Sequence, residues 1–371
     1  MASGQFVRSP DRRLEPLHRR LAEFNRLRLK PSFDVIDWQQ QLRQDTELRV
    51  LEGHFIESER AQVQEAASKI PTQPREFTGW LDSLREASAA QSEPLFQWLA
   101  EHATRSDINW LIAQELSGDD NLEDLLALAQ VNRPWRAKSE MARNYWDEMG
   151  QGSASATSAR LLEELKHELH MDSTEPPVWE NLARSNLMLG LATNRRYGFQ
   201  VLGALGLLEL NAGATGALLN AGLKRLGYSP ASCAYFAARE TLSPLRALSW
   251  NAGVLLPYVA QDARTAAAIA EGALMRLVAD ARCVQRYQRE LKVPESWARS
   301  NSAPGHAPAA TAPESGGCQD AANLAEGYRA VIRYRRPPRL RSHGLLAMGA
   351  RVRHRAYTCL IVQHSFAPSL C

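Results

Sequence analysis

The sequence predicts an all-α protein. Apolar side chains recur at helical spacing from about residue 33 to residue 295, and no alternating strand pattern extends beyond about five residues. Glycine and proline clusters interrupt this pattern where connections are expected, for example at Pro71 and Pro74. The 371 residues are 44% hydrophobic and 23% charged, which excludes a wholly disordered or collagen-like chain.

The first helix is expected in residues 11–29. Leu14, Leu17, Leu21 and Phe24 follow a three-four-three spacing there, with arginines on the opposite face, which is typical of an amphipathic helix. The segment also contains acidic residues and lacks the apolar stretch of a secretory signal. We therefore expect a helix that packs on the rest of the protein, and no targeting peptide.

The following helices have lengths that suit a helical bundle. They are expected at residues 33–69, 76–88, 92–104, 107–117, 120–130, 137–149, 155–171, 178–194, 197–225, 231–260 and 263–291. Residues 201–223 are the most apolar segment, but Glu209, Asn211 and five glycines interrupt it. No membrane span is therefore expected.

Composition divides the chain into three segments. Residues 1–32 are expected to form an N-terminal arm with the amphipathic helix, and residues 33–295 the helical domain. Residues 296–371 begin with a stretch rich in Ala, Pro, Ser and Gly, which is typical of a flexible linker. Residues 328–371 contain nine arginines and no acidic residue, so we expect a disordered basic tail, with an altered reading frame as the alternative.

Charge and cysteine usage limit the partners and the location. A basic tail is of a kind that binds nucleic acid or acidic membranes, but the body lacks a basic face, so no nucleic-acid partner is expected. The five cysteines form no C-x-x-C pair. This spacing argues against a zinc ribbon or a disulfide framework and favours a cytoplasmic location.

Three carboxylates lie on otherwise apolar faces of separate expected helices. Glu115 follows leucine and isoleucine side chains at helical spacing, and Glu148 follows Met141 and Tyr145. Glu209 is surrounded by leucine, alanine and glycine, which let a neighbouring helix come close. Because a buried charge is costly unless it is paired or ligated, these three are the candidates for a metal or acid-base site.

Four segments resemble the haem-oxygenase-like diiron oxidases, a family of iron-containing redox enzymes. They are LIAQELSGDDNLEDLLALAQ, ARNYWDEMGQG, GALGLLELNAGATGALLNAGLKRLGYSPASCAYF and AIAEGALMRLVADARCVQRYQREL. The resemblance covers residues 33–291. It implies a haem-oxygenase-like helical bundle, an oxidoreductase activity that uses O2, and two iron ions held by glutamates, an aspartate and histidines. It matches the glutamate ligands to Glu115, Glu148 and Glu209.

Four of the ligand positions that the resemblance implies hold other residues. Ser158 stands where a histidine is expected, ten residues after the second glutamate. The segment FAARETLSPLR places Arg239, Ser243 and Arg246 where the family pattern has histidine, aspartate and histidine. No histidine occurs between residues 171 and 305. Since arginine stays protonated in proteins, it cannot replace a metal ligand.

The residues therefore predict no metal cofactor, and iron is implied by the resemblance alone. We expect Arg239 and Arg246 to offset the charges of Glu115, Glu148 and Glu209 through charge-assisted hydrogen bonds. Such a network would occupy the chamber that the family uses for metal, and Arg239→Ala would destabilise the fold strongly.

Three functions remain open. The first is a non-catalytic protein with a degenerate metal site that acts as a partner or regulator of an active relative, or as a homodimer. The second is an active O2-dependent oxidase or oxygenase that acts on a small organic substrate with a non-standard site. The third is a metal-free protein that binds a charged small molecule. The catalytic residues, the substrate and the pathway stay unassigned.

Two further groups of residues are expected to be structural. Glu164, His167 and His170 resemble a metal motif of helical bundles, but their helical positions place them away from the chamber. The tryptophans on or beside the inward helices are expected in the core; they are Trp110, Trp146 and Trp250.

Overall fold

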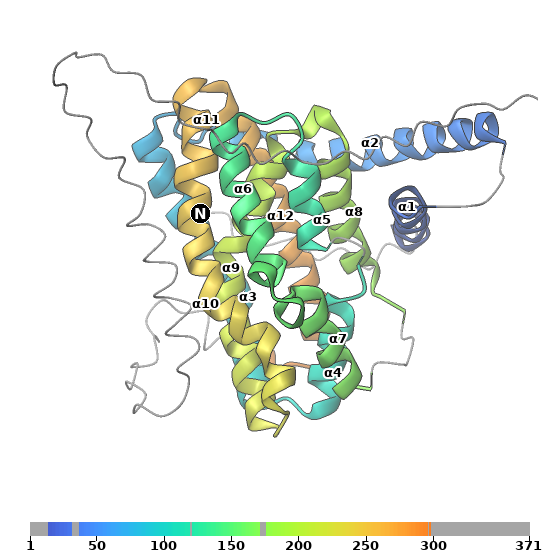
Figure 1. The fold of residues 1–371 in the computed structure, drawn as a ribbon, viewed down its shortest axis with the longest axis vertical. Helices are drawn as coiled ribbons and strands as arrows, with labels where there is room; N and C mark the ends of the chain where they lie inside the picture. Colours follow the sequence, from blue (N-terminus) through green and yellow to red (C-terminus); the bar gives the residue numbers. More distant parts are fainter. Residues whose placement is uncertain (1–13, 32–36, 119–120, 171–175, 296, 298–371) are drawn as a thin grey trace, which may run out of the picture. The chain divides into compact units, whose positions relative to one another are not determined.

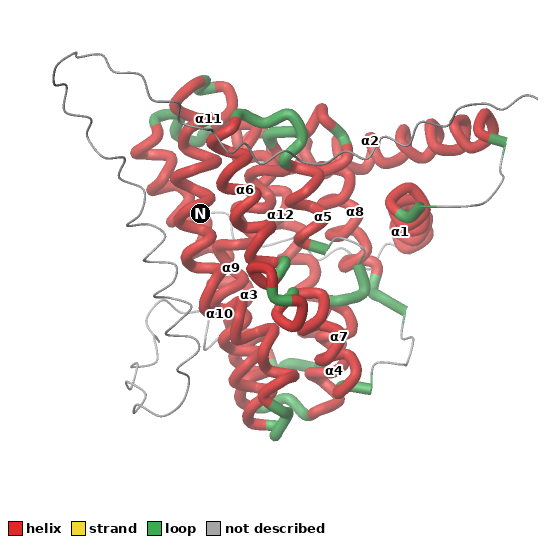
Figure 2. Tube along the Cα trace, in the orientation of Figure 1, coloured by secondary structure: helices red, strands yellow, loops and turns green. Residues whose placement is uncertain are grey.

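The computed structural model describes residues 14–31, 37–118, 121–170, 176–295 and 297. The chain divides into two units, Met1–Thr311 and Ala312–Cys371, and every described residue lies in the first. The expected linker and basic tail lie outside the described residues, except for Trp297. Every regular element of the described residues is a helix, as Figure 2 shows, so the predicted all-α class is confirmed.

The helices are named in chain order in Figure 1. They are α1 (Leu14–Leu29), α2 (Trp38–Ser68), α3 (Pro74–Glu101), α4 (Arg105–Glu115), α5 (Leu122–Ala129), α6 (Trp135–Glu148), η1 (Gly150–Gly152), η2 (Ala154–Ala156), α7 (Ser158–Glu168), α8 (Trp179–Thr193), η3 (Arg195–Tyr197), α9 (Gln200–Arg225), α10 (Pro230–Trp250), η4 (Asn251–Leu255), α11 (Leu256–Gln261) and α12 (Arg264–Glu290).

Two of the expected helix boundaries are wrong. The helices expected at 76–88 and 92–104 form one helix, α3, which continues through Pro94. Its apolar face is buried on both sides of this proline, so packing stabilises the helix across the lost hydrogen bond. The helix expected at 231–260 is divided in three, because a π-helical turn at Asn251–Leu255 separates α10 from α11.

Helix α9 is the central helix of this unit and contacts α3, α8, α10 and α12 (Figure 1). It is long and apolar enough to cross a membrane by length and composition, but 61% of its most apolar window is buried inside the structure. Its apolar composition therefore matches a position in the core. Two glycines set its distance from α12: a Cβ on Gly203 would lie 1.8 Å from the carbonyl oxygen of Ile269, and one on Gly272 would lie 1.8 Å from that of Gln200.

Helix α1 packs on α8 through a buried histidine. The ring of His18 stacks on Trp179, with 5.7 Å between centroids, and meets the edge of Phe55 at 4.8 Å. Asn186 donates hydrogen bonds from its side chain to the backbone carbonyl of His18 (2.9 Å) and accepts one from Asn25 (2.8 Å). The expected packing helix is therefore present, although its polar buried residues were not foreseen.

We predict that Gly203→Ala destabilises the protein by at least about 3 kcal/mol, because the added methyl group meets backbone that cannot rotate away. The matched control is Gly53→Ala in α2, where a Cβ meets nothing within 4 Å. This control should be neutral or slightly stabilising, since alanine favours a helix more than glycine does. Chemical denaturation of both variants measures the difference, and equal stabilities would contradict the close crossing.

We also predict that acid weakens the α1 contact through His18. Burial lowers the pKa of His18 to about 4, and the charge of Arg282 adds to this shift. Between pH 6.5 and about pH 4 the unfolded chain takes up a proton that the folded protein does not, so the free energy of unfolding falls with falling pH. His18→Phe removes this contribution of up to about 3 kcal/mol. Thermal melts of both proteins across this range should show a shallower acid slope for the variant.

Candidate functional site

The candidate site lies where α6, α9 and α10 meet. Glu148 is the last residue of α6, Glu209 lies within α9, and Arg246 lies near the end of α10. A Cβ on Gly213 of α9 would lie 3.0 Å from the ring of Pro244 in α10, so the small residue lets the two helices approach closely. The sequence thus brings acidic and basic side chains from three helices into one buried volume.

Arg246 is the centre of this cluster. Its guanidinium donates a hydrogen bond from Nη1 to Oε1 of Glu148. The same Nη1 lies 3.7 Å from Oε1 of Glu209, and Nε lies 3.5 Å from Oδ2 of Asp147. All four side chains are buried, with at most 3% of each exposed. One positive charge therefore faces three carboxylates in a region that excludes water.

The three carboxylates respond differently to this environment. Burial raises the pKa of Glu148, but the charges of Arg246 and Arg239 outweigh it and hold the pKa below its ordinary value. Burial raises the pKa of Glu209 above its ordinary value, and the two arginines counter this only in part. The pKa of Asp147 is also raised, again by burial. Glu148 is thus the carboxylate that stays ionised most readily.

Glu209 keeps unmet hydrogen-bonding capacity. Neither of its carboxylate oxygens has a hydrogen-bond partner within the described residues, and the buried hydroxyl of Ser243 has none either. Ser243 nevertheless lies close enough to Glu209 to lower its pKa slightly. Burial therefore makes Glu209 easier to protonate than an exposed glutamate.

Arg239 occupies a more open position than Arg246. Its guanidinium lies 4.0 Å from Oε1 of Glu148 and over the ring of Tyr235, 5.7 Å from the centroid. The hydroxyl of Ser158, at the start of α7, contributes to the low pKa of Glu148. The structure thus brings together six of the seven positions that the resemblance implied.

Glu115 is the exception, and the expectation that Arg239 and Arg246 offset its charge was wrong. Its carboxylate pairs instead with Arg184 of α8, whose Nη2 lies 3.0 Å from Oε1. Arg184 also lies 3.5 Å from Asp280 of α12 and donates to the side chain of Asn181 at 2.6 Å. Glu115 is about one-third exposed, so it belongs to a separate ion-pair group.

These residues do not fit a diiron centre. The orphaned oxygens of Glu209 are the feature most compatible with a bound cation, but a guanidinium already lies 3.7 Å away. No histidine accompanies the carboxylates, and two arginines would face any metal placed between them. Within the described residues, no group of three His, Cys, Asp or Glu side chains is arranged to hold a metal ion.

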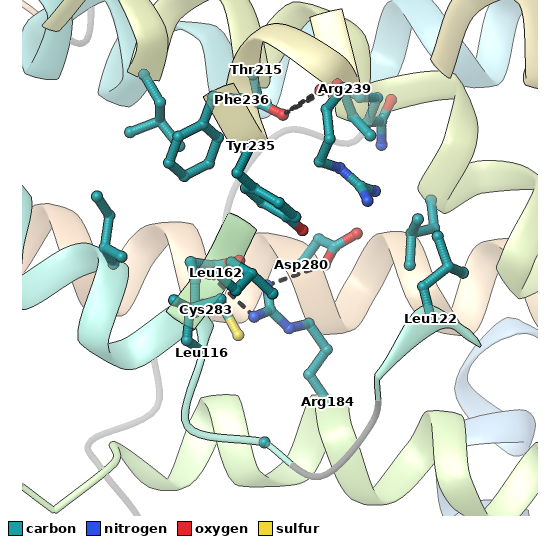
Figure 3. A pocket seen from close by; sticks show the side chains of 18 of the residues that line it. Leu116, Leu122, Leu162, Arg184, Thr215, Tyr235, Phe236, Arg239, Asp280 and Cys283 are labelled. Atoms are coloured by element: carbon teal, nitrogen blue, oxygen red, sulfur yellow. Dashed lines mark hydrogen bonds and ion pairs between the residues drawn. The ribbon is translucent and has the colours of Figure 1, made fainter. Parts of the chain in front are cut away.

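A cavity of about 250 Å³ adjoins the cluster. Figure 3 shows Arg239 and Tyr235 extending into it from one side, with Arg184 on the opposite side. Glu115, Glu148 and Ser158 also line it, whereas Glu209 and Arg246 lie outside its lining. Arg239 with Glu148, and Arg184 with Glu115, are therefore two separate charged groups in the lining of one cavity.

Sequence reasoning missed several residues of this chamber. Asp147 directly precedes Glu148 in the sequence, and this neighbouring position is the one sequence feature that could have pointed to its place beside Arg246. No local pattern pointed to Arg184 or Asp280, because they meet Glu115 only through the tertiary fold.

The expectations for the structural residues are partly correct. His167 and His170 are exposed, and Glu164 pairs with Arg160, so this motif faces solvent as expected. Trp250 is fully buried, as expected for the core. The same expectation for Trp146 was wrong, since 53% of this side chain is exposed.

Comparison with known families gives one match. Residues 109–281 match the model of a family described as iron-containing redox enzymes. This is the family that the sequence resembles. The match lies within residues 33–291, where the resemblance was recognised, and it contains every residue of the charge cluster. No curated protein matches the chain.

We predict that Arg246→Leu destabilises the protein by about 3–5 kcal/mol at neutral pH, because it leaves buried carboxylates without a counter charge. Without the arginine, burial favours the neutral acids, so the deficit should shrink as the pH falls from about 7 to about 5. Urea denaturation at both pH values measures the effect.

Two controls accompany this variant. Arg196→Leu removes an exposed arginine that pairs with Glu57 and should change stability little. Adding Glu148→Gln and Glu209→Gln to Arg246→Leu removes two of the three carboxylates that face Arg246 and should recover part of the loss. A deficit that is independent of pH would show that Arg246 acts by packing alone.

Proposed function

We propose that this chain is a non-catalytic member of the iron-containing redox enzyme family that assembles no diiron centre and acts by binding. The observation that carries this proposal is the guanidinium of Arg246, which bonds to Glu148 and lies 3.7 Å from Glu209. A fixed organic cation there supplies the positive charge that metal ions supply in an iron-binding relative. Metal would have to displace it against the cost of leaving a buried arginine unpaired.

The alternative of an active O2-dependent oxidase is supported by family membership alone. Its carboxylates would be Glu148 and Glu209, and both face Arg246. Glu115 would have to leave Arg184 to join them. The residues in place therefore favour a role without oxygen chemistry.

The binding role has two forms. The first, carried over from the missing ligands, is association with a relative that keeps an intact metal site, or with a second copy of this chain. The second is binding of a small molecule, which the cavity beside Arg239 supports. We place either role in the cytoplasm, on the cysteine spacing and on Cys233 and Cys283, which are buried free thiols.

Metal analysis tests the proposal directly. We predict that the protein purified from iron-supplemented cells holds no stoichiometric iron, and that a chelator leaves its melting temperature unchanged. Near two equivalents of iron, or a melting temperature lowered by chelator, would overturn the proposal.

A variant that is expected to gain iron binding complements this test. Restoring the four implied ligands as Ser158→His, Arg239→His, Ser243→Asp and Arg246→His should create iron binding, since these positions already surround Glu148 and Glu209. Iron content and chelator-sensitive melting of this variant, compared with the wild type, measure the gain.

A further inference from the structure

The cavity beside the charge cluster is walled by both apolar and charged side chains. Its apolar lining comes from several helices; it includes Phe96, Ile112, Leu116, Leu122, Leu162 and Phe236. Its charged side chains are those of Arg239, of the group formed by Arg184, Glu115 and Asp280, and of Glu123, Glu148, Lys166 and Arg276. Apolar walls with a few placed polar groups are typical of small-molecule sites, and this volume suits a small ligand.

Most of the guanidinium groups in the cavity wall are already used by the protein. Arg184 is bonded to Glu115 at 3.0 Å and to Asn181 at 2.6 Å. Arg276 is bonded to Asp280 at 2.9 Å through Nε. Each of these two arginines is thus paired with a carboxylate, although Nη1 of Arg276 has no hydrogen-bond partner within the described residues.

Arg239 differs from them. Among the described residues its one ion pair is to Glu148, at 4.0 Å, which is longer than a hydrogen bond. Glu148 already accepts a hydrogen bond from Arg246. The guanidinium of Arg239 lies over the ring of Tyr235, and a hydrogen bond to the Tyr235 side chain helps to raise its pKa. Within the described residues no carboxylate lies within hydrogen-bond distance of this guanidinium, and it lines the cavity, so it can meet a further acceptor there.

The surroundings select the charge of that acceptor. Glu123, Glu148 and Lys166 also line the cavity. Because Glu148 pairs with Arg246 and lies 4.0 Å from Arg239, it offsets the charge of Arg239 only in part, so this guanidinium can compensate one negative charge and not two. The planar fork of arginine matches the two oxygens of a carboxylate. The apolar lining then suits a short hydrocarbon or aromatic body attached to that carboxylate.

We propose that this cavity binds a small organic monocarboxylate, with the carboxylate paired to Arg239 beside Tyr235 and the apolar body between Ile112, Leu162 and Phe236. The inference rests on the proposed function, because it assigns the chamber to a ligand that needs no metal. It specifies the class of small molecule for that binding role.

Calorimetric titration of the metal-free full chain in the presence of chelator tests the inference. The probes are hexanoate and phenylacetate, each compared with its neutral amide, hexanamide or phenylacetamide. We expect the acids to bind at millimolar or lower concentration and the amides to bind at least about tenfold more weakly, because only the acids pair with the guanidinium. Inorganic phosphate should not compete with either acid.

Variants locate the binding. Arg239→Leu should abolish binding of the acids, and Arg239→Lys should weaken it, since lysine keeps the charge and loses the fork. Arg264→Leu, which removes an exposed arginine outside the cavity lining, should bind as the wild type does. Because the comparison of acid with amide uses the wild-type protein, it holds even if a variant at Arg239 fails to fold.

The outcomes separate the two proposals. Equal binding of acids and amides, unchanged binding by a folded Arg239→Leu variant, or no binding of any probe would overturn the monocarboxylate site and leave the metal-free assignment intact. Binding of the acids that requires added iron would overturn both.

Discussion

The ion pairs of Arg246 join side chains from α6, α9 and α10 inside the protein, where each is at most 3% exposed. Charges in such a place are tolerated only when they balance. Asp147, Glu148 and Glu209 would carry three negative charges against the two positive charges of Arg239 and Arg246. Burial raises the pKa of Asp147 and of Glu209, so these two carboxyl groups take up a proton more readily than Glu148 does as the pH falls. The two arginines balance most of the remaining negative charge without any metal.

The close packing of these helices is set by small residues that lie outside the charge cluster. The close approach of α9 to α10 at Gly213, and of α9 to α12 at Gly203 and Gly272, depends on small residues and not on any ligand of the chamber. The helical arrangement therefore does not depend on which side chains fill the chamber. The match to a family and the activity of this chain are separate questions, since a fold does not determine its function.

How far the sequence predicts this protein depends on the range of the interaction. Helical spacing located nearly every helix, and it placed Glu148 and Glu209 on buried faces, because both properties are local. The partner of Glu115 was not predictable, since Arg184 is 69 residues away and only the tertiary fold brings them together. His18 was missed for the same reason, because its burial is created by Trp179 of a distant helix.

Trp146 shows how helical periodicity can misplace a residue at the edge of a buried helix face. It follows Tyr145 on a helix whose inward face is well marked, but a difference of one residue moves a side chain by about 100° around the helix. Periodicity therefore identifies a face and leaves the residues at its edge uncertain. The structure resolves this edge by exposing Trp146 and burying Asp147 and Glu148.

The position of Arg246 also has a consequence for which substitutions this interior tolerates. Removing the arginine alone leaves acidic groups uncompensated in the interior, and a single histidine in its place would supply too few ligands to hold an ion. Exchanging the buried cation of this cluster for another would therefore require several substitutions together, whereas residues that line only the adjoining cavity can change one at a time.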